Sequence, residues 1–223
     1  MLTETVGQQK RRAAVIVGRM NPPTVGHYKV FDVAKKYIRD NKDLGLDAVP
    51  IVVVVAGKET SKDKSKNPLT ANERISFMTG SGKANGIKFL VASSAFDAFE
   101  EVRKAGFEPI AIAAGSDRAD KYLEMLDKYF KTKDGKQIKH YAITLQRVAE
   151  NKEHKTAGLD DILKYMGDEI PTDMVSASLA RRAVELDEFE KFVVITGLSE
   201  KPELARKMFD KIKHSMETND GST

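Results

Sequence analysis

Short apolar runs that alternate with helical stretches constrain the fold of this chain more than any other feature of its sequence. Residues 13–17 (AAVIV) and 49–56 (VPIVVVVA) are rich in β-branched side chains and lack the polar alternation of a half-exposed strand. Such runs are typical of parallel strands that are covered on both faces. Three further strand candidates lie at residues 87–92, 109–114 and 140–145.

The stretches between these runs have the pattern of helices. We predict helices over residues 25–39, 71–78, 95–105 and 118–129. Strands that alternate with helices indicate right-handed βαβ crossovers and a parallel sheet. The sequence therefore predicts an α/β fold, with a Rossmann-like, doubly wound parallel sheet of about five strands.

The pattern changes after residue 146. Residues 147–172 carry many charges and few periodic apolar positions, so we expect a loop with at most one short helix. Three more helices are predicted, over residues 176–186, 188–195 and 201–216. The end of the chain therefore differs in character from the alternating strands and helices that precede it.

The length of 223 residues suits one large domain or one domain with an appendage. We predict a Rossmann-like domain at 13–186, a helical extension at 187–216, and flexible ends at 1–12 and 217–223. The last helix has an apolar stripe, formed by Leu204, Met208, Phe209 and Ile212. Such a stripe more often packs on its own domain than serves assembly, and a homo-oligomer is the alternative interpretation.

Composition excludes several classes of protein. The absence of cysteine excludes disulfides, thiol catalysis and thiolate metal sites. No apolar run approaches the ~20 residues of a membrane span, and the first residues lack the apolar stretch of a secretion signal, so we expect a cytoplasmic protein without a membrane partner. The net charge of +4 is too small to argue for nucleic-acid binding, but it suits an anionic substrate if the positive charges gather at one site.

The turn after the first strand has the features of a phosphate site. Residues 18–27 read GRMNPPTVGH. Gly18 permits a close backbone approach, and the two prolines delay the start of the helix. Thr24 is placed to begin the helix, and His27, three residues later, points the same way. A hydroxyl, an imidazole and a helix N-terminus would therefore converge on one anion.

This turn resembles the T/H-x-G-H signature of the nucleotidyltransferase superfamily, with Thr24 where many members have a first histidine. Residues 175–181 (VSASLAR) resemble the second signature, I-S-x-[ST]-x-x-R, in which Ser178 and Arg181 lie one helical turn apart. Residues 115–118 (GSDR) follow a predicted strand and resemble the G-x-D turn of the superfamily.

Residues 67–74 (NPLTANER) resemble a stretch of the archaeal-type nicotinamide-mononucleotide adenylyltransferases, although leucine replaces the usual phenylalanine. The closest resemblance is therefore to those enzymes. It implies transfer of a nucleotidyl group from ATP or CTP to a phosphate-bearing acceptor, with release of pyrophosphate. The favoured reaction transfers AMP from ATP to nicotinamide mononucleotide and gives NAD.

The resemblance also implies roles for individual residues. Catalytic roles fall to His27, Thr24 and Arg181. Nucleotide-binding roles fall to Gly18, Arg19, Met20, Gly26, Gly115, Asp117, Ser176 and Ser178. Candidate acceptor-binding residues are Lys58, Asn67 and Arg74. Mg²⁺ is expected to arrive with the triphosphate, and no protein side chain is assigned as a metal ligand.

Alternatives remain open at this stage. A cytidylyltransferase or a pantetheine-phosphate adenylyltransferase would carry the same signatures. Outside the enzymes, the chain could be a nucleotide-binding module without turnover, or an RNA-associated protein that uses the lysine-rich run at 58–66. We do not favour nucleic acid as a partner, and salt dependence of binding distinguishes it from a nucleotide pocket.

Overall fold

The computed structural model of the protein describes residues 11–42, 48–57, 63–130, 139–145, 159, 162–163, 170 and 175–220. Its elements follow one another as β1 (Arg11–Gly18), α1 (Val25–Asp40), β2 (Ala48–Val55), α2 (Ala71–Gly80), β3 (Lys88–Ala92), α3 (Ala95–Lys104), β4 (Phe107–Gly115), α4 (Ser116–Tyr129), β5 (Tyr141–Leu145), α6 (Ala177–Glu185), α7 (Phe189–Thr196) and α8 (Pro202–Asp220). Each predicted strand and helix corresponds to one of these elements. Across the described residues, no helix combines the length and the apolar character needed to cross a membrane.

Regular structure extends further toward both ends of the chain than the sequence indicated. β1 begins at Arg11, because Arg11 and Arg12 pair with the neighbouring strands β4 and β2. α8 continues to Asp220, four residues beyond the predicted end, and the Thr218 hydroxyl donates to a backbone carbonyl one turn earlier. Regular structure therefore includes residues 11–12 and 217–220, which belong to the ends that we expected to be flexible.

Two predictions fall largely outside the part of the chain that the structure describes. Residues 1–10 and 221–223 are not among the described residues. Of the predicted loop at 147–172, only Leu159, Ile162, Leu163 and Ile170 are described. The prediction for this loop therefore stays a prediction.

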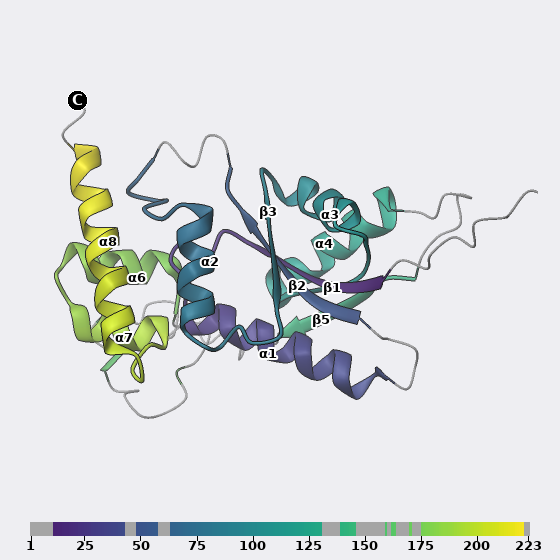
Figure 1. Ribbon diagram of the computed structural model, residues 1–223, viewed down its shortest axis with the longest axis horizontal. Coiled ribbons are helices and arrows are strands. Elements are labelled where there is room, and N and C mark those ends of the chain that lie inside the picture. The colour runs from purple at the N-terminus through teal and green to yellow at the C-terminus, as the bar shows by residue number, and fades with distance from the viewer. Residues whose placement is uncertain are drawn as a thin grey trace, which may run out of the picture.

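The five strands form one parallel sheet with the order β3-β2-β1-β4-β5. The chain starts at β1 in the middle, builds the sheet outward through β2 and β3, and then crosses to β4 and β5 on the other side (Figure 1). The strand order thus reverses between β1 and β4. Open α/β sheets bind their ligands beyond the carboxyl ends of the strands at such a point, because the loops there diverge and leave a crevice.

Helices cover both faces of the sheet. On one face, α1 and α2 pack on the strands, and Ala14 and Ile16 of β1 are buried with Phe31 of α1. On the other face, α3 and α4 do the same, and Val15 and Val17 are buried with Phe99 of α3. Alternate residues of β1 therefore enter different cores, which explains why its sequence is a continuous apolar run. The predicted doubly wound α/β fold is confirmed.

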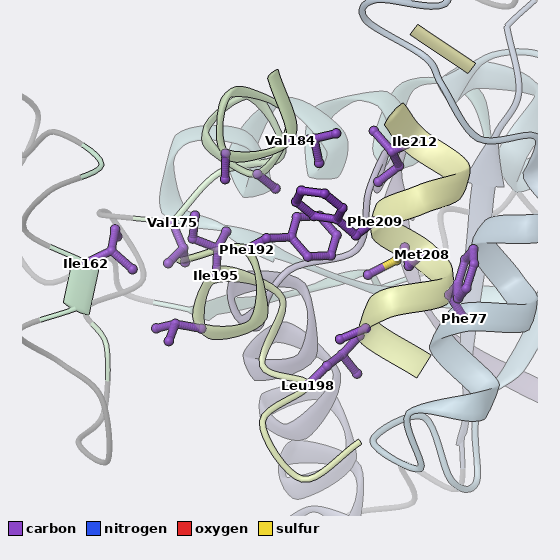
Figure 2. Packing of buried hydrophobic residues seen from close by; sticks show 14 of the residues in the cluster. Phe77, Ile162, Val175, Val184, Phe192, Ile195, Leu198, Met208, Phe209 and Ile212 are labelled. Carbon is purple, nitrogen blue, oxygen red and sulfur yellow. The ribbon is translucent and has the colours of Figure 1, made fainter. Parts of the chain in front are cut away.

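The last three helices form a separate apolar cluster against α2 (Figures 1 and 2). Phe209 of α8 meets Phe192 of α7 edge to face, with ring centroids 5.3 Å apart. Phe77 of α2 enters the same cluster, as does Leu69 from the loop before α2. The predicted stripe on α8 is therefore buried within its own chain, which was the favoured interpretation.

Candidate functional site

A cavity of about 530 Å³ lies at the carboxyl edge of the sheet, where the strand order reverses. Its lining comes from the loop between β1 and α1, the ends of β4 and β5, the start of α4, and the start of α6. The predicted site residues on this lining are Gly18, Arg19, Met20, Thr24, Gly26, His27, Asn67, Gly115, Ser176, Ser178 and Arg181. The fold thus brings the two signature segments, about 150 positions apart in sequence, to one cavity.

The loop after β1 follows an unusual backbone path into this cavity. Met20 has φ 51°, in the left-handed region that few non-glycine residues adopt, and the peptide bond between Asn21 and Pro22 is cis. The Met20 side chain is buried in the core beneath α1. A Cβ added at Gly18 would lie 3.1 Å from the Met20 side chain, so glycine allows Met20 to fold back over the end of β1. The shape of the loop therefore depends on residue types that the signature specifies.

The side chain of His27 is held by Thr24, which is the N-cap residue of α1. The Thr24 backbone N–H donates to His27 Nδ1 at 3.0 Å, and the Thr24 hydroxyl lies 2.9 Å from the same nitrogen. A backbone N–H can only donate, so Nδ1 must accept, and the proton of the neutral imidazole is on Nε2. Thr24 thereby selects the tautomer in which Nε2 is a hydrogen-bond donor.

Arg181 lies on the first turns of α6, which Ser176 begins by accepting the Leu179 backbone N–H at 3.0 Å. Its Nη1 donates to the carbonyl of Asn21 at 2.6 Å, and its Nη2 donates to the Ser178 hydroxyl at 3.1 Å. Burial, together with the neighbouring charge of Arg19, lowers the pKa of the Arg181 guanidinium. A bound anion would relieve both effects, since it would offset the repulsion and compensate for lost hydration.

The charged side chains described on the cavity lining are all cationic. They belong to Arg19, Lys66, Arg118 and Arg181. No aspartate or glutamate occurs among the lining residues whose side chains are described. The described side chains of the lining therefore carry an excess of positive charge, although the chain as a whole has a net charge of only +4. The cavity therefore suits a ligand with several negative charges.

Three polar lining residues were not among the predicted site residues, namely Asn21, Lys66 and Arg118. Lys66 lies in the charged run after β2, and its Nζ forms an ion pair with Asp63 at 2.9 Å. Arg118 lies in the GSDR segment on the first turn of α4. Because both follow strands that end at this edge, the rule for ligand sites in open α/β sheets could have identified them.

Arg74, a predicted acceptor-binding residue, is buried within the protein. It is 3% exposed and is not on the cavity lining. Its guanidinium donates to the carbonyls of Thr70 at 3.1 Å, Val55 at 3.0 Å, and Arg19. These contacts give Arg74 partners within the protein, and its predicted contact with an acceptor stays a prediction.

The remaining predictions cannot be placed in full. Lys58 lies outside the described residues, and the side chain of Asp117 is also outside them, although its backbone belongs to the first turn of α4. Within the described part of the chain, no group of three or more His, Asp or Glu side chains is arranged to hold a metal ion.

Comparison with known proteins gives one family. The model of the family described as "Cytidylyltransferase-like" matches residues 15–183, which include the turn after β1 and α6 as far as Ala183. No match is found among curated proteins. One solved structure that matches this chain is described as a macrolide-efflux protein from Streptococcus pneumoniae, with 20% identity and a TM-score of 0.49. The match covers 85% of this chain and 56% of that one, so this chain spans little more than half its length.

Proposed function

The chain belongs to the cytidylyltransferase-like family, within the nucleotidyltransferase superfamily, and from this premise we propose that it transfers a nucleotidyl group from a nucleoside triphosphate to a phosphate-bearing acceptor. One observation carries the proposal. His27 and Arg181, from the two signature segments, line the same cationic cavity at the switch point of the sheet. A triphosphate and a phosphate acceptor together bring the negative charge that this lining would neutralise.

The proposed reaction forms one bond and breaks another. An oxygen of the acceptor phosphate attacks the α-phosphorus of the triphosphate, the bond to the bridging oxygen breaks, and pyrophosphate leaves. No side chain has to act as a nucleophile, because the protein positions the reactants and neutralises the developing charge. Both reacting groups are anionic, so their approach requires cations on several sides.

His27 is proposed to donate from Nε2 to the phosphates near the breaking bond. The acceptor role of Nδ1 toward Thr24 supports this, since it keeps the donor on the other nitrogen. Arg181 is proposed to hold the β- and γ-phosphates, with Ser176 and Ser178 near it on α6. A well-aimed donor of this kind typically contributes about 10²–10³ in rate.

The other lining residues are proposed to support the same phosphates. Arg19, Lys66 and Arg118 would neutralise further charge around the cavity. Gly18, Gly26 and Gly115 have no side chain to keep a phosphate or ribose away from the backbone. We propose that Mg²⁺ enters bound to the triphosphate, because its ligands there are substrate oxygens rather than a protein cluster.

We propose ATP as the nucleotide and nicotinamide mononucleotide as the acceptor, with NAD as the product. The NPLTANER segment supports this choice, and Asn67 from that segment lies on the cavity lining. The acceptor role of Asn67 and Lys58 is part of this proposal, and that of Arg74 stays a prediction.

The test is a panel that measures pyrophosphate release. ATP and CTP, each with Mg²⁺, are combined with nicotinamide mononucleotide, phosphopantetheine and phosphocholine as acceptors. We expect release with ATP and nicotinamide mononucleotide, and loss of release in His27→Ala. Release with another pair would correct the substrates but keep the reaction class. Saturable thermal stabilisation by ATP without any release would identify a binding module and refute the enzyme.

A further inference from the structure

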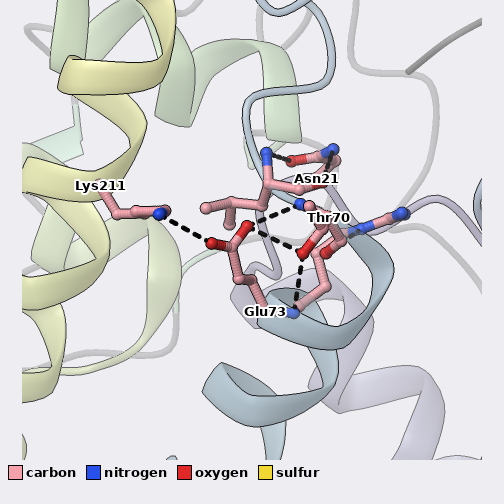
Figure 3. A network of polar contacts seen from close by, with 6 residues as sticks. Asn21, Thr70, Glu73 and Lys211 are labelled. Atoms are coloured by element: carbon pink, nitrogen blue, oxygen red, sulfur yellow. Dashed lines mark hydrogen bonds and ion pairs between the residues drawn. The ribbon is translucent and has the colours of Figure 1, made fainter.

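The loop after β1 is held against the start of α2 by a buried amide. Asn21 is 2% exposed, and its Nδ2 donates to the Leu69 carbonyl at 2.9 Å. Its Oδ1 accepts from the Leu69 backbone N–H at 3.1 Å (Figure 3). The carboxamide therefore satisfies both backbone groups of one residue, much as a neighbouring strand would. Among the uncharged side chains, only glutamine has the same carboxamide group, and its side chain is one carbon longer.

A buried guanidinium holds the same loop two residues earlier, at Arg19. Arg74 joins the start of α2 at Thr70, the end of β2 at Val55, and the loop at Arg19. Burial, with a smaller effect of the Arg19 charge, lowers the pKa of Arg74 to about 10, so the guanidinium keeps its charge at neutral pH. The planar fork reaches carbonyls in several directions, which the single ammonium of lysine does not do.

The two contacts lie on either side of the unusual backbone at Met20. A residue with positive φ persists only where the surrounding structure holds it. Here Arg74 fixes the carbonyl of Arg19, and Asn21 is fixed to Leu69. The path of the loop through Met20 is thus determined from both ends by α2 and the loop before it.

The position of Arg181 depends on this loop. Its Nη1 donates to the Asn21 carbonyl at 2.6 Å, across 160 positions of sequence. A displacement of Asn21 would therefore move the guanidinium on the cavity lining. Thr24 and His27 follow the same loop, so their places at the cavity also depend on its path.

We propose that Asn21 and Arg74 are positioning residues for nucleotidyl transfer, which fix the loop at 19–24 on α2 and thereby place Arg181 and His27 around the substrate phosphates. The inference rests on the proposed function, and it assigns to the NPLTANER segment a task beyond acceptor binding. Misplacement of reacting groups by about 1 Å can cost about 10²-fold in rate. Loss of either contact is therefore expected to lower kcat by about 10- to 100-fold.

The experiment uses Asn21→Asp, Arg74→Lys and Arg74→Met in the full chain. Asn21→Asp preserves the shape but removes the donor to the Leu69 carbonyl. Arg74→Lys keeps the charge but cannot reproduce the fork. Phe99→Leu is the control. Phe99 of α3 is fully buried on the opposite face of the sheet, so this substitution removes packing without changing a contact of the loop.

Four quantities are measured for each protein: kcat and KM from pyrophosphate release, Tm, and the ATP concentration that gives half of the maximal rise in Tm. We expect kcat to fall more than KM rises in the loop variants, and the half-saturating ATP concentration to rise about three- to tenfold. The control should change Tm only. We expect the double variant Asn21→Asp with Arg74→Lys to lose less than the product of the two single losses, because both act on one loop.

Each outcome decides between alternatives. Loop variants with kcat and half-saturating ATP within twofold of wild type overturn the positioning role. Losses that follow Tm, and that Phe99→Leu reproduces at the same Tm, assign Asn21 and Arg74 to folding only and also overturn it. If wild type releases no pyrophosphate with any pair, the proposed function fails, while the ATP titration by Tm still decides whether the loop variants misplace the phosphate-binding residues.

Discussion

The rim of the cavity and the C-terminal helical cluster are held together by different forces. At the rim, Asn21 and Arg181 donate to backbone carbonyls, and the buried Arg74 donates to the same loop from outside the lining. These bonds specify direction as well as distance. In the cluster, Phe192 and Phe209 are fully buried and meet edge to face. Apolar contact contributes more free energy but specifies direction less strictly. We infer that the rim determines geometry and the cluster determines stability.

The largest expected effect tests the cluster. Phe209→Ala should reduce the free energy of unfolding by about 3–5 kcal/mol, because it leaves a cavity in place of the ring that now packs on Phe189 and Phe192. Denaturant unfolding measures the change. At a temperature where the variant stays folded, kcat should remain within about twofold of wild type. A kcat loss as large as that of a rim variant would contradict the inference that the cluster determines stability and the rim determines geometry.

Arg181→Met tests the rim, and here we expect the reverse pattern: a large change in kcat and a small change in stability. We expect kcat to fall about 10²–10³-fold, since a donor to the phosphates is removed. The free energy of unfolding should change by less than about 1 kcal/mol, because burial already lowers the pKa of this guanidinium and its removal also relieves repulsion with Arg19. Steady-state kinetics and denaturant unfolding measure the two effects. Arg182→Met, an exposed neighbour on α6, is the matched control and should leave kcat unchanged.

Gly197→Ala tests the contact between the extension and α1. Gly197 ends α7 with φ 65°, and an added Cβ would lie 2.7 Å from Cγ2 of Val25, the first residue of α1. The left-handed backbone and the overlap together should cost about 1–3 kcal/mol of stability. Gly106→Ala shares the positive φ, but nothing lies within 4 Å of its Cβ position, so it isolates the backbone part. Equal losses in the two variants would show that the Val25 contact is unimportant.

Glu73→Gln should have the smallest effect. Burial raises the pKa of Glu73, but hydrogen bonds from Thr70 and the ion pair with Lys211 outweigh it, so the pKa is lowered overall. The charged form therefore stabilises the folded state at pH values above the unfolded pKa of 4.5, and this contribution is lost as pH falls through the folded pKa. We expect a difference of about 0.2–1 kcal/mol at pH 7 that becomes smaller when the pH is lowered to 3. Unfolding curves at both pH values measure it, and a difference that grows toward low pH would contradict it.

The fold could be predicted from the sequence because its strands are buried on both faces. Alternate residues of β1 enter two cores, so its whole run is apolar and stands out from the helices beside it. The placement of His27 and Arg181 on one cavity could be predicted, because each is the last residue of a recognisable signature near the start of a helix. In both cases, the information lies within a few neighbouring residues.

The role of Arg74 could not be predicted in the same way. Its three carbonyl partners belong to three different segments, and no local pattern shows that these segments meet around one side chain. The buried amide of Asn21 is a similar case, because its partner Leu69 lies 48 positions away. Arg74 resembles a ligand-binding residue in the sequence, but in the fold it is buried and donates to backbone carbonyls. That burial depends on packing that only the folded chain has.

Leu69 belongs to both regions. Its main chain pairs with Asn21, and its side chain is buried with Phe77 among the last three helices. Exchange of α7 and α8 for another module would therefore also change the apolar cluster that buries Leu69 and Phe77, next to the loop at 19–24 that Leu69 holds. For protein engineering, the last two helices and the loop at 19–24 are therefore connected through one residue, Leu69, and should be redesigned together.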